Sequence, residues 1–476
     1  MASSKSPLRL LVELISNNVE ALETRLFSEG LQFPLLADPY DPKNPVERLL
    51  SENPAMLEAT SVIVAAASQL VAMVRSPVQT MMEGSLLFHL PSCIRAAIES
   101  NMVEIIRDSG PQGIHANEIS KMNDTDPVKA ARILRLLANH HIFTEIRPDV
   151  FAPNRLSSIL DSGKSVAELK QSPSSRYVAS DKAGIPALVL MHTDEAFKGS
   201  AYFTEAFLSP KTAHSTRAVD SPWNYAFGTD TFLFDWYDRP ENELLKTRFS
   251  FAMACSTKLE PPKAILAGFQ WSELSRGAVV VDVGGGVGST ARVIAEAMPH
   301  IELVVQDRWS VIEDAQEYWA GVAPDLIASG RVKLEAHNFL TPQPIHNAAV
   351  FLLRWIMHDW SDAQAVLILR HLRDAATSDT KLVVVDIILP YTCNDPEITN
   401  RIPGAERPLP PAPLLRNMGA ASNMMYWLDF QMFVLGNSQE RTLGHFVSLA
   451  AQSGWRVEQV HHIAGSSLGQ YVSVPI

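Results

Sequence analysis

The chain has 476 residues and a mass of 52.4 kDa, which is more than one ordinary domain holds, so we expect two or three packed units. Apolar residues make up 46% and charged residues 19%, proportions that suit a globular protein with a buried core and exclude wholesale disorder. The net charge is −12, from 40 Lys and Arg against 52 Asp and Glu, which is the wrong sign for binding the phosphate backbone of a nucleic acid.

The cysteines and the apolar runs bear on the compartment. Cys93, Cys255 and Cys393 are odd in number and widely spaced, which fits neither a disulfide framework nor a zinc knuckle and indicates a reducing interior. The first residues lack the apolar stretch and cleavage site of a signal peptide. The most apolar run, residues 62–74, is shorter than the roughly 20 residues that cross a bilayer. We therefore expect a cytoplasmic protein without a membrane partner.

The first 165 residues are predicted to be mostly helical. Residues 1–90 carry apolar side chains at helical spacing, interrupted by a proline-rich link at 33–45. Residues 91–165 read as successive helices followed by two short strands, which is the pattern of a winged helix. Between residues 93 and 160, eight basic side chains are balanced by eight acidic ones, so the basic face of a DNA-reading module is missing. We interpret residues 1–90 as N-terminal helices for dimerisation and residues 91–165 as a winged-helix-like dimerisation unit.

Residues 166–260 form a predicted helical region that is rich in aromatic side chains. Their spacing suits ordinary core packing, but together they could line a pocket for a flat apolar ligand. We predict that aromatic and methionine side chains from this region and from the C-terminal part line such a substrate pocket. The candidates are Met191, Phe203, Trp223, Phe227, Trp427 and Met432.

From residue 261 onward, strands alternate with helices. The sequence predicts strands at 277–283, 301–306, 332–337, 348–354 and 381–389, helices at 289–297 and 361–376, and a terminal hairpin at 456–463 and 470–474. This alternation is typical of an α/β fold with a doubly wound, mostly parallel Rossmann-like sheet, here ending in an antiparallel hairpin. A capping box is predicted at Ser361 to Gln364. A proline-rich stretch at 390–413 is predicted to be a surface insertion.

A glycine-rich turn between a predicted strand and a predicted helix is the sharpest local motif. Gly284, Gly286 and Gly288 are spaced G-x-G-x-G, whereas the dinucleotide fingerprint is G-x-G-x-x-G, so the spacing argues against an NAD-dependent enzyme. Asp282, just before the turn, would repel a pyrophosphate but attract a sulfonium ligand with an amino-acid tail. Asp307 ends the next strand, where a carboxylate can accept hydrogen bonds from both ribose hydroxyls. The pattern favours a cationic nucleoside ligand.

Two segments carry a family resemblance: residues 280–289, and residues 352–362 with the sequence Leu-Leu-Arg-Trp-Ile-Met-His-Asp-Trp-Ser-Asp. They resemble the S-adenosylmethionine-dependent O-methyltransferases of the caffeate and flavonoid type and their fungal polyketide-modifying relatives. The resemblance implies a homodimer that needs no metal and leaves S-adenosylhomocysteine as product. It implies a catalytic base at His358 with acidic partners at Asp386 and Glu440. The implied contacts to the methyl donor are Asp282, Gly284, Gly286, Gly288, Asp307, Arg308, Asn338, Phe339 and Arg354.

The chemistry of these residue types agrees with the resemblance. A phenol has a pKa near 10 and attacks a methyl sulfonium far better as the phenolate, so a base such as His358 must take its proton. Asp386 or Glu440 could hydrogen-bond the other ring nitrogen and stabilise the imidazolium. We therefore predict an O-methyltransferase that acts on a hydroxyl of an aromatic small molecule. The alternatives are an NAD-type oxidoreductase and a non-catalytic winged-helix regulator.

Overall fold

The computed structural model describes four stretches of the chain: residues 5–177, 184–261, 263–395 and 401–476. They form two compact units. The helical unit comprises Met1–Phe207 and Pro222–Leu259, and the sheet unit comprises Leu208–Ser221 and Glu260–Ile476. The boundary after Leu259 lies beside the predicted one, whereas the predicted divisions after residues 90 and 165 fall inside the helical unit. Residues 1–4 of the predicted first unit and 396–400 of the predicted insertion lie outside the described residues.

The segment Leu208–Ser221 belongs to the sheet unit, although its place in the sequence predicts membership of region 166–260. The side-chain amide of Asn437 donates hydrogen bonds to the backbone oxygens of Ser215 and Arg217 at 3.0 and 3.1 Å. These bonds join positions more than two hundred residues apart, so the local composition of residues 208–221 could not predict that they belong to the sheet unit.

The described part of the helical unit begins with helices that each carry a proline in the first turn. They are α1 (Pro7–Ser28), α2 (Pro45–Glu52), α3 (Pro54–Val74) and α4 (Pro77–Leu86). Proline suits this position because its missing N–H would have no partner inside the helix anyway. Leu22, Leu26 and Met56 are buried together in a small core. This core ties α1 to α3.

Helix α3 has 21 mostly apolar residues, and by length and composition alone it could cross a membrane. The sequence predicts a shorter apolar run because the alanines and methionine that follow Pro54 are less hydrophobic than the valines from residue 62 onward. Core helices of soluble proteins pass the same test. Much of α3 is nevertheless exposed within one copy of the chain, and α4 has no buried residue. We call the exposed apolar side chains of these helices the α3–α4 apolar face: Val64, Val71, Met73, Val74, Val78, Met81, Met82 and Leu86.

Helices and a small sheet follow in the region predicted as winged-helix-like. The helices are α5 (His89–Glu99), α6 (Met102–Ser109), α7 (Ala116–Asn123) and α8 (Pro127–Asn139), and the strands are β1 (Ile114–His115), β2 (Thr144–Arg147) and β3 (Val150–Ala152). The strands pair antiparallel in the order β1-β3-β2. Ile106, Leu134 and Phe151 are fully buried in one core, which joins two helices to the sheet.

The remaining helices of the helical unit are short except for the last. They are α9 (Val166–Gln171), α10 (Ile185–Met191), α11 (Phe197–Ala201), α12 (Phe203–Leu208), α13 (Pro222–Phe227), α14 (Leu233–Tyr237) and α15 (Glu243–Leu259). Helix α15 carries Arg248, which is buried and pairs with Asp194 at 2.8 Å and with Glu195. Helices α10 and α15 pack against each other along this part of the unit.

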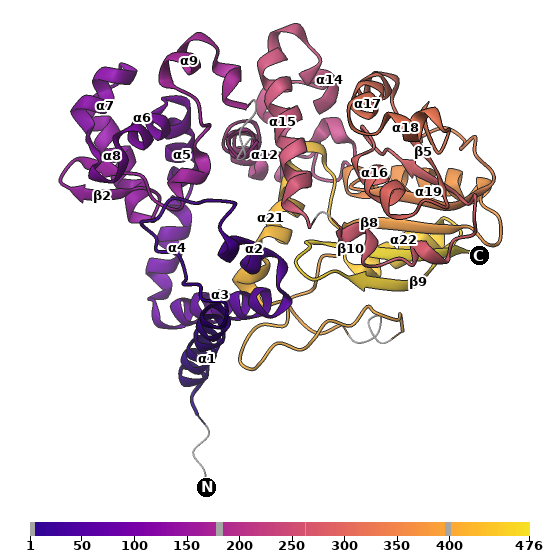
Figure 1. Ribbon diagram of the computed structural model, residues 1–476, viewed down its shortest axis with the longest axis horizontal. Helices are drawn as coiled ribbons and strands as arrows, with labels where there is room; N and C mark the ends of the chain where they lie inside the picture. The colour runs from indigo at the N-terminus through magenta and orange to yellow at the C-terminus, as the bar shows by residue number, and fades with distance from the viewer. Residues whose placement is uncertain (1–4, 178–183, 262, 396–400) are drawn as a thin grey trace. The chain divides into compact units, whose positions relative to one another are not determined.

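The sheet unit is built on a mixed sheet with the order β6-β5-β4-β7-β8-β10-β9 (Figure 1). Its strands are β4 (Val279–Val283), β5 (Glu302–Asp307), β6 (Val332–Ala336), β7 (Ala348–Arg354), β8 (Lys381–Ile387), β9 (Trp455–His462) and β10 (Leu468–Pro475). Strands β4 to β8 are parallel, and β10 pairs antiparallel with both β8 and β9. Each strand lies within two residues of the predicted bounds, and the Rossmann-like sheet with a terminal hairpin is confirmed.

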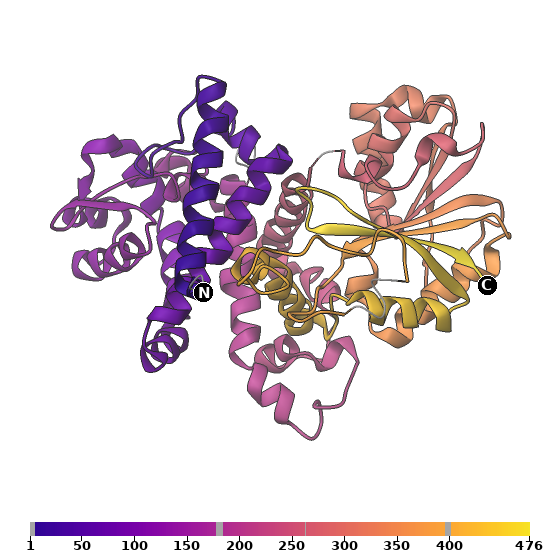
Figure 2. The ribbon, with the colours of Figure 1, turned by 90° about the horizontal axis from the view of Figure 1, so that it is seen from below.

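Helices cover both faces of this sheet (Figure 2). Helices α16 (Ser289–Ala297), α17 (Trp309–Val322) and α18 (Pro324–Ala328) lie on one face, and α19 (Asp362–Ala375) and α22 (Leu443–Gln452) lie on the other. Neighbouring residues of one strand serve opposite faces, as the pleat requires: Val280 packs with Trp319, and Val281 packs with Phe446. The sequence predicts no element for α17, α22 or α21 (Asn423–Gly436).

Two local predictions are corrected. The capping box of α19 does not form, because Ser361 makes no side-chain bond to the helix backbone and its hydroxyl donates instead to the Gln364 side chain at 3.1 Å. The described part of the proline-rich stretch is more than a surface insertion. The Val460 N–H of edge strand β9 donates to the backbone oxygen of Pro403 at 2.9 Å, and Ala405 is buried in the core. This stretch therefore covers an otherwise exposed sheet edge.

Candidate active site

The glycine-rich turn joins β4 to α16. Gly284, Gly286 and Gly288 adopt φ values of 71°, 60° and 85°, left-handed conformations that glycine reaches without strain. Gly285, which the spacing argument missed, is required for a different reason: a Cβ there would lie 2.7 Å from the carboxylate of Asp282. A Cβ on Gly286 would meet no atom within 4 Å. The turn therefore leaves an open cradle at the start of α16.

Asp282 and Arg354 place opposite charges beneath the turn. Asp282 is 1% exposed, and its Oδ2 atom has no hydrogen-bond partner among the described residues. Burial raises the pKa of Asp282 to about 7, although the nearby Arg354 guanidinium acts in the opposite direction. Burial also lowers the pKa of Arg354, against the pull of Glu260 and Asp282. An unpaired, buried carboxylate oxygen of this kind can hold a cationic ammonium group.

Asp307 ends β5 opposite the same turn. Its Oδ2 accepts a hydrogen bond from the Gly286 N–H at 2.9 Å, and its Oδ1 accepts one from the Arg308 N–H at 2.7 Å. A carboxylate has about four acceptor positions, so lone pairs remain for two ribose hydroxyls. The Arg308 side chain is exposed. The Asp307 carboxylate thus binds the glycine turn and keeps acceptor positions for the hydroxyls of a ligand.

The loop after β6 contributes the predicted pair Asn338 and Phe339. Phe339 packs edge-on against Trp360 with ring centroids 5.5 Å apart, and a Cβ on Gly284 would lie 3.3 Å from its ring. Phe339 therefore lies beside the turn. Asn338 is exposed, and its Oδ1 accepts the Leu340 N–H at 3.1 Å, which leaves the side-chain NH₂ group for a ligand.

His358 lies in a single 3₁₀ turn, Met357–Asp359, directly after β7. Its Nδ1 atom is 2.7 Å from Oε1 of Glu440, whose side chain is almost fully buried. The His358 side chain keeps 12% of its surface exposed, and its Nε2 atom points to the other side of the ring, 3.6 Å from Oδ1 of Asp359. Of the two acids that the sequence left open, Glu440 is the one that bonds the histidine.

Three carboxylates set the charge of this histidine. Burial disfavours the imidazolium, but the negative charges of Asp359, Glu440 and Asp386 outweigh it and raise the pKa of His358 to about 10. Asp386 lies on β8, is 6% exposed, and has an Oδ1 atom without a hydrogen-bond partner in the described chain. Burial raises the pKa of Asp386 to about 7. Asp386 therefore acts on His358 through its charge.

Two residues of the site, Asp359 within the segment 352–362 and Arg441 after Glu440, were given no role by the sequence. Asp359 faces the free nitrogen of the histidine, as described above. Arg441 is buried and donates to the backbone oxygens of Met357 and Trp360 at 2.5 and 2.7 Å. It thereby clamps the turn that carries His358. Their common signal is position alone: each directly follows a predicted residue, His358 or Glu440.

The predicted pocket residues are divided between the two units. Met191 and Trp223 are buried in the helical unit, where Trp223 stacks on Phe227 with ring centroids 4.8 Å apart. Phe203, also in this unit, is half-buried and stacks on Phe207. On α21 of the sheet unit, Met432 is half-buried and Trp427 is 69% exposed. A pocket that unites these side chains stays a prediction.

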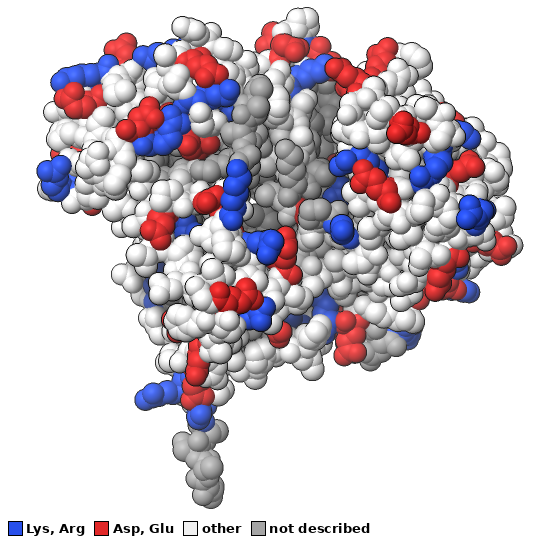
Figure 3. Space-filling model, in the orientation of Figure 1, with Lys and Arg blue, Asp and Glu red and all other residues white. Residues whose placement is uncertain are grey.

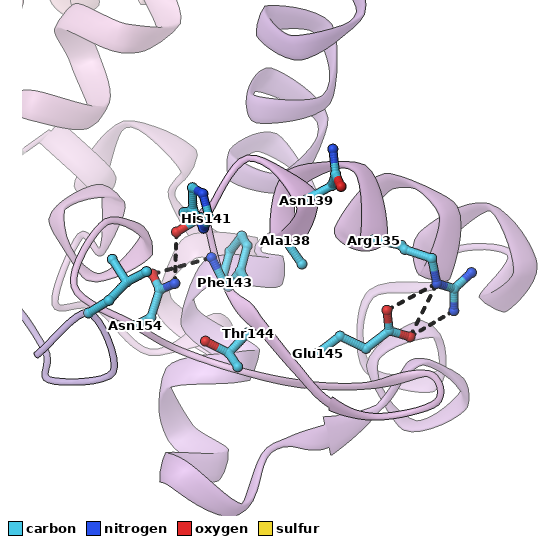
Figure 4. A pocket seen from close by; sticks show the side chains of 9 residues that line it. Arg135, Ala138, Asn139, His141, Phe143, Thr144, Glu145 and Asn154 are labelled. Atoms are coloured by element: carbon cyan, nitrogen blue, oxygen red, sulfur yellow. Dashed lines mark hydrogen bonds and ion pairs between the residues drawn. The ribbon is translucent and has the colours of Figure 1, made fainter. Parts of the chain in front are cut away.

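A cavity of about 400 Å³ lies in the winged-helix-like region of the helical unit (Figure 4). On one side of it, Arg135 donates to both oxygens of Glu145 and to Asp149. On the other, the Asn154 side chain donates to the backbone oxygen of His141. Its charged groups pair with each other and the Asn154 amide bonds the backbone, which is typical of a structural cavity. The Arg135 guanidinium on α8 is paired with two carboxylates, so its charge is not available to a DNA phosphate.

Relatives at 42% and 41% identity match this chain along nearly its whole length. A family model described as an O-methyltransferase domain matches residues 208–402. An O-methyltransferase of Armillaria gallica is 42% identical over 99% of this chain and 100% of its own length, and 4-O-methyltransferase 1 of Phanerochaete chrysosporium is 41% identical over 96% of each chain. The chain belongs to the O-methyltransferase family. Sterigmatocystin 8-O-methyltransferase of Aspergillus flavus is a more distant relative of this O-methyltransferase, 29% identical over 69% of this chain and 70% of its own.

Solved structures share the fold of this O-methyltransferase. OxaC superposes with a TM-score of 0.65 at 18% identity and covers 98% of this chain and 100% of its own. The mitomycin 7-O-methyltransferase MmcR superposes with a TM-score of 0.61 at 21% identity, over 86% of this chain and 99% of its own. At these identities the likeness establishes the S-adenosylmethionine-dependent methyltransferase fold.

The residues of the turn fit S-adenosylmethionine, the methyl donor of this family. The unpartnered Oδ2 atom of Asp282 suits the ammonium group of the amino-acid tail, and the free acceptor positions of Asp307 suit the ribose. Phe339 and Asn338 offer a ring face and an amide for the base. When bound, this donor supplies a methyl group on a positively charged sulfur. Among the described residues, no cluster of three His, Cys, Asp or Glu side chains could hold a metal ion.

Proposed function

We propose that this O-methyltransferase transfers a methyl group from S-adenosylmethionine to a phenolic or enolic hydroxyl of an aromatic small molecule, with His358 as the general base. The observation that carries the proposal is the 2.7 Å bond between Nδ1 of His358 and Glu440. In the neutral ring this bond puts the proton on Nδ1 and leaves the lone pair on Nε2. In this tautomer, Nε2 can accept a proton from the hydroxyl of the acceptor.

The proposed reaction conserves atoms and charge. The hydroxyl proton of the acceptor passes to Nε2 of His358, the oxygen electron pair forms the new bond to the methyl carbon, and the electrons of the carbon–sulfur bond remain on sulfur. Glu440 and Asp386 stabilise the imidazolium that forms. A base with a pKa of about 10 matches a phenol with a pKa near 10, so the proton transfer is nearly balanced.

The resting ring is mostly protonated at neutral pH, because the pKa of His358 lies well above 7. Only the neutral ring can accept a proton. Activity should therefore rise with pH as the neutral form becomes more abundant. The positive sulfur of the methyl donor would lower this pKa when bound, because it adds a like charge near the imidazolium.

We propose further that two copies of the chain associate through the α3–α4 apolar face. Val78 and Met81 are 72% and 69% exposed on a helix that buries none of its side chains in one copy. Exposed apolar patches of this kind are typical of protein interfaces. The winged-helix-like region, residues 91–165, would then support dimerisation. Acidic and basic side chains are intermixed on the face drawn in Figure 3, which is unfavourable for nucleic acid, and we expect the dimer in the cytoplasm without a membrane partner.

A labelled-methyl transfer screen tests the main proposal. Phenols, flavonoids, anthraquinones and other polyketides would be incubated with labelled S-adenosylmethionine, and products scored by mass. His358→Ala should abolish transfer to every acceptor of the native enzyme and leave equilibrium binding of S-adenosylmethionine intact. His346→Ala, at an exposed position, is the control that should change neither. Retained turnover in His358→Ala would overturn the role of the base, and binding of NAD(H) without S-adenosylmethionine would overturn the function.

A further inference from the structure

Three buried polar atoms behind the base lack hydrogen-bond partners among the described residues. They are Oδ1 of Asp386, Oε2 of Glu440 and the hydroxyl of Tyr471. All three residues are less than 7% exposed. Leaving a buried polar group unpaired costs on the order of 1–3 kcal/mol, so three such atoms in one region call for a common explanation.

The strand register places Tyr471 on the same side of the sheet as Asp386. Strands β8 and β10 pair antiparallel, with Gly469 opposite Asp386 and Tyr471 opposite Val384. Residues two apart on a strand face the same side, and so do directly opposed residues. Asp386 and Tyr471 are thus diagonal neighbours across the β8–β10 pair. The Tyr471 ring stacks on Phe446 with centroids 4.1 Å apart, which fixes its direction.

The charges around Tyr471 keep its hydroxyl a donor. Burial and the negative charges of Asp386 and Glu440 raise the pKa of Tyr471, while Arg441 and Arg407 act in the opposite direction. The phenol therefore stays protonated through the working pH range. The Tyr471 hydroxyl lacks an acceptor, and one oxygen each of Asp386 and Glu440 lacks a donor, among the described residues. One buried water among three such atoms would satisfy them all, since a buried water makes about three hydrogen bonds.

We propose that the Tyr471 hydroxyl is a positioning group for the base: it donates, through one buried water, to Asp386 and Glu440 and keeps negative charge on the carboxylates behind His358. The inference rests on the proposed role of His358. Tyr471 touches neither reactant and acts through the acids. It extends the base cluster to the terminal hairpin, an element that the resemblance assigns no role.

The direction in which the pKa of His358 should change on loss of the Tyr471 hydroxyl follows from the charges around Asp386 and Glu440. Hydrogen bonds to a carboxylate favour its ionised form, so loss of the hydroxyl raises the pKa of Asp386. Asp386 then carries less negative charge. His358, which faces Asp359, Glu440 and Asp386, becomes a weaker base and its pKa falls. The positive side chains of Arg441 and Arg407 remain in place and compensate for neither change.

The test is Tyr471→Phe, which keeps the ring on Phe446. The pKa of His358, followed by NMR of the labelled imidazole, should fall by about half a unit or more, because donation to a carboxylate has effects of this order. The acidic limb of kcat/KM should move to lower pH by the same amount, with kcat at alkaline pH reduced roughly 3- to 10-fold. Tyr391→Phe, whose hydroxyl bonds Thr442, is the control and should leave the titration unchanged.

Two further variants test whether the effect of Tyr471 on the pKa of His358 passes through Asp386 and depends on the strength of the hydroxyl as a donor. On an Asp386→Asn background, Tyr471→Phe should cause a smaller additional shift, because only Glu440 is left as a charged partner of the hydroxyl. Site-specific 3-fluorotyrosine at position 471, a stronger donor, should raise the pKa of His358. An unmoved titration in Tyr471→Phe, or the same shift with and without Asp386, would overturn the inference. The NMR titration needs no turnover, so its result is separate from any failure to find methyl transfer.

Discussion

The Glu440 carboxylate is the closest charge to His358 and should govern its protonation. Glu440→Gln keeps the shape of the side chain but removes its negative charge, so the imidazolium loses stabilisation and the pKa of His358 falls. The neutral, reactive ring is then populated at lower pH, and the acidic limb of kcat/KM moves to lower pH. Because the imidazolium also forms during the reaction, kcat should fall about 10- to 100-fold. Rates measured between pH 6 and pH 10 check both effects.

The control for this prediction is Glu458→Gln. Glu458 lies on β9 and bonds the side chains of Lys381 and Arg456 at the surface. Glu458→Gln should leave the pH dependence of kcat/KM unchanged. If the acidic limb of kcat/KM moved to higher pH in Glu440→Gln, the assigned role of Glu440 in stabilising the imidazolium of His358 would be contradicted.

The buried carboxylate of Asp282 should lower the free energy of unfolding when it is ionised, although it contributes to binding of the methyl donor. Its pKa in the folded chain, about 7, lies above the ordinary value of 3.8, so folding disfavours the ionised form and stability falls as the pH rises from about 4 to about 7. Asp282→Asn should therefore raise the free energy of unfolding by about 1–2 kcal/mol at pH 8 and change it little at pH 4. The same variant should bind S-adenosylmethionine at least about 10-fold more weakly, since a charged partner is lost. Thermal unfolding and calorimetry measure the two effects.

The comparison for this variant is Asp325→Asn on α18, where the carboxylate is exposed. It should change neither stability nor binding. Equal stability of Asp282→Asn and the native chain at both pH values would contradict the burial argument.

At the residue scale, the sequence identified side chains that stand in a motif and missed those placed by tertiary contact. His358 follows a strand in a specific segment, and the structure brings Glu440 to it from eighty-two residues away. Tyr471 was missed because a tyrosine in a terminal strand is ordinary core composition. Only the register of β8 and β10 brings it to the face of Asp386.

At the element scale, two Gly→Ala variants can distinguish the effect of the glycine turn on ligand binding from its effect on stability. Gly286 and Gly277 both have positive φ, at 60° and 77°, and a Cβ on either would meet no atom within 4 Å. Each Gly→Ala change should thus cost about 1 kcal/mol of backbone strain. Only Gly286→Ala adds a methyl group to the cradle, so only it should weaken S-adenosylmethionine binding, by about 10-fold or more. Equal loss of binding in both variants would refute the assignment of the cradle.

Elements with strong local patterns were predicted well, and those defined by their partners were not. The strand at 348–354 and the helix at 289–297 have the predicted bounds. The proline-rich stretch was predicted as a surface insertion because it is too long for a tight connection, yet its Arg407 donates to the backbone oxygen of Ile388 at 3.1 Å. That contact joins two loops, and no periodicity in the sequence encodes it.

At the scale of the whole molecule, the α3–α4 apolar face predicts self-association. The native protein should sediment with twice the mass of its 52.4 kDa chain. The double variant Val78→Glu, Met81→Lys places charges on α4 and should convert the dimer to a monomer, because burying them costs several kcal/mol in an apolar interface. Val128→Glu changes a 67% exposed valine on α8 and serves as the control. A native monomer in sedimentation would contradict the prediction.

The fold alone does not determine the reaction of such a molecule. One solved structure of a pericyclic reaction enzyme superposes with a TM-score of 0.62 at 18% identity. Family membership of this chain rests on the much closer relatives at 42% and 41% identity. The reaction itself has to be argued from His358, Glu440 and the turn, since a fold can carry several chemistries.

The chain passes between its two units three times, at residues 207, 221 and 259, and this has a consequence for synthesis. Residues 208–221 leave the ribosome long before α21, whose following residue Asn437 holds them to the sheet unit. The nascent sheet unit therefore stays incomplete until the final forty residues emerge, and a fragment that starts at residue 260 would lack one of its own pieces. Expression trials and domain exchanges with relatives should cut before residue 208, which is also where the O-methyltransferase family model begins.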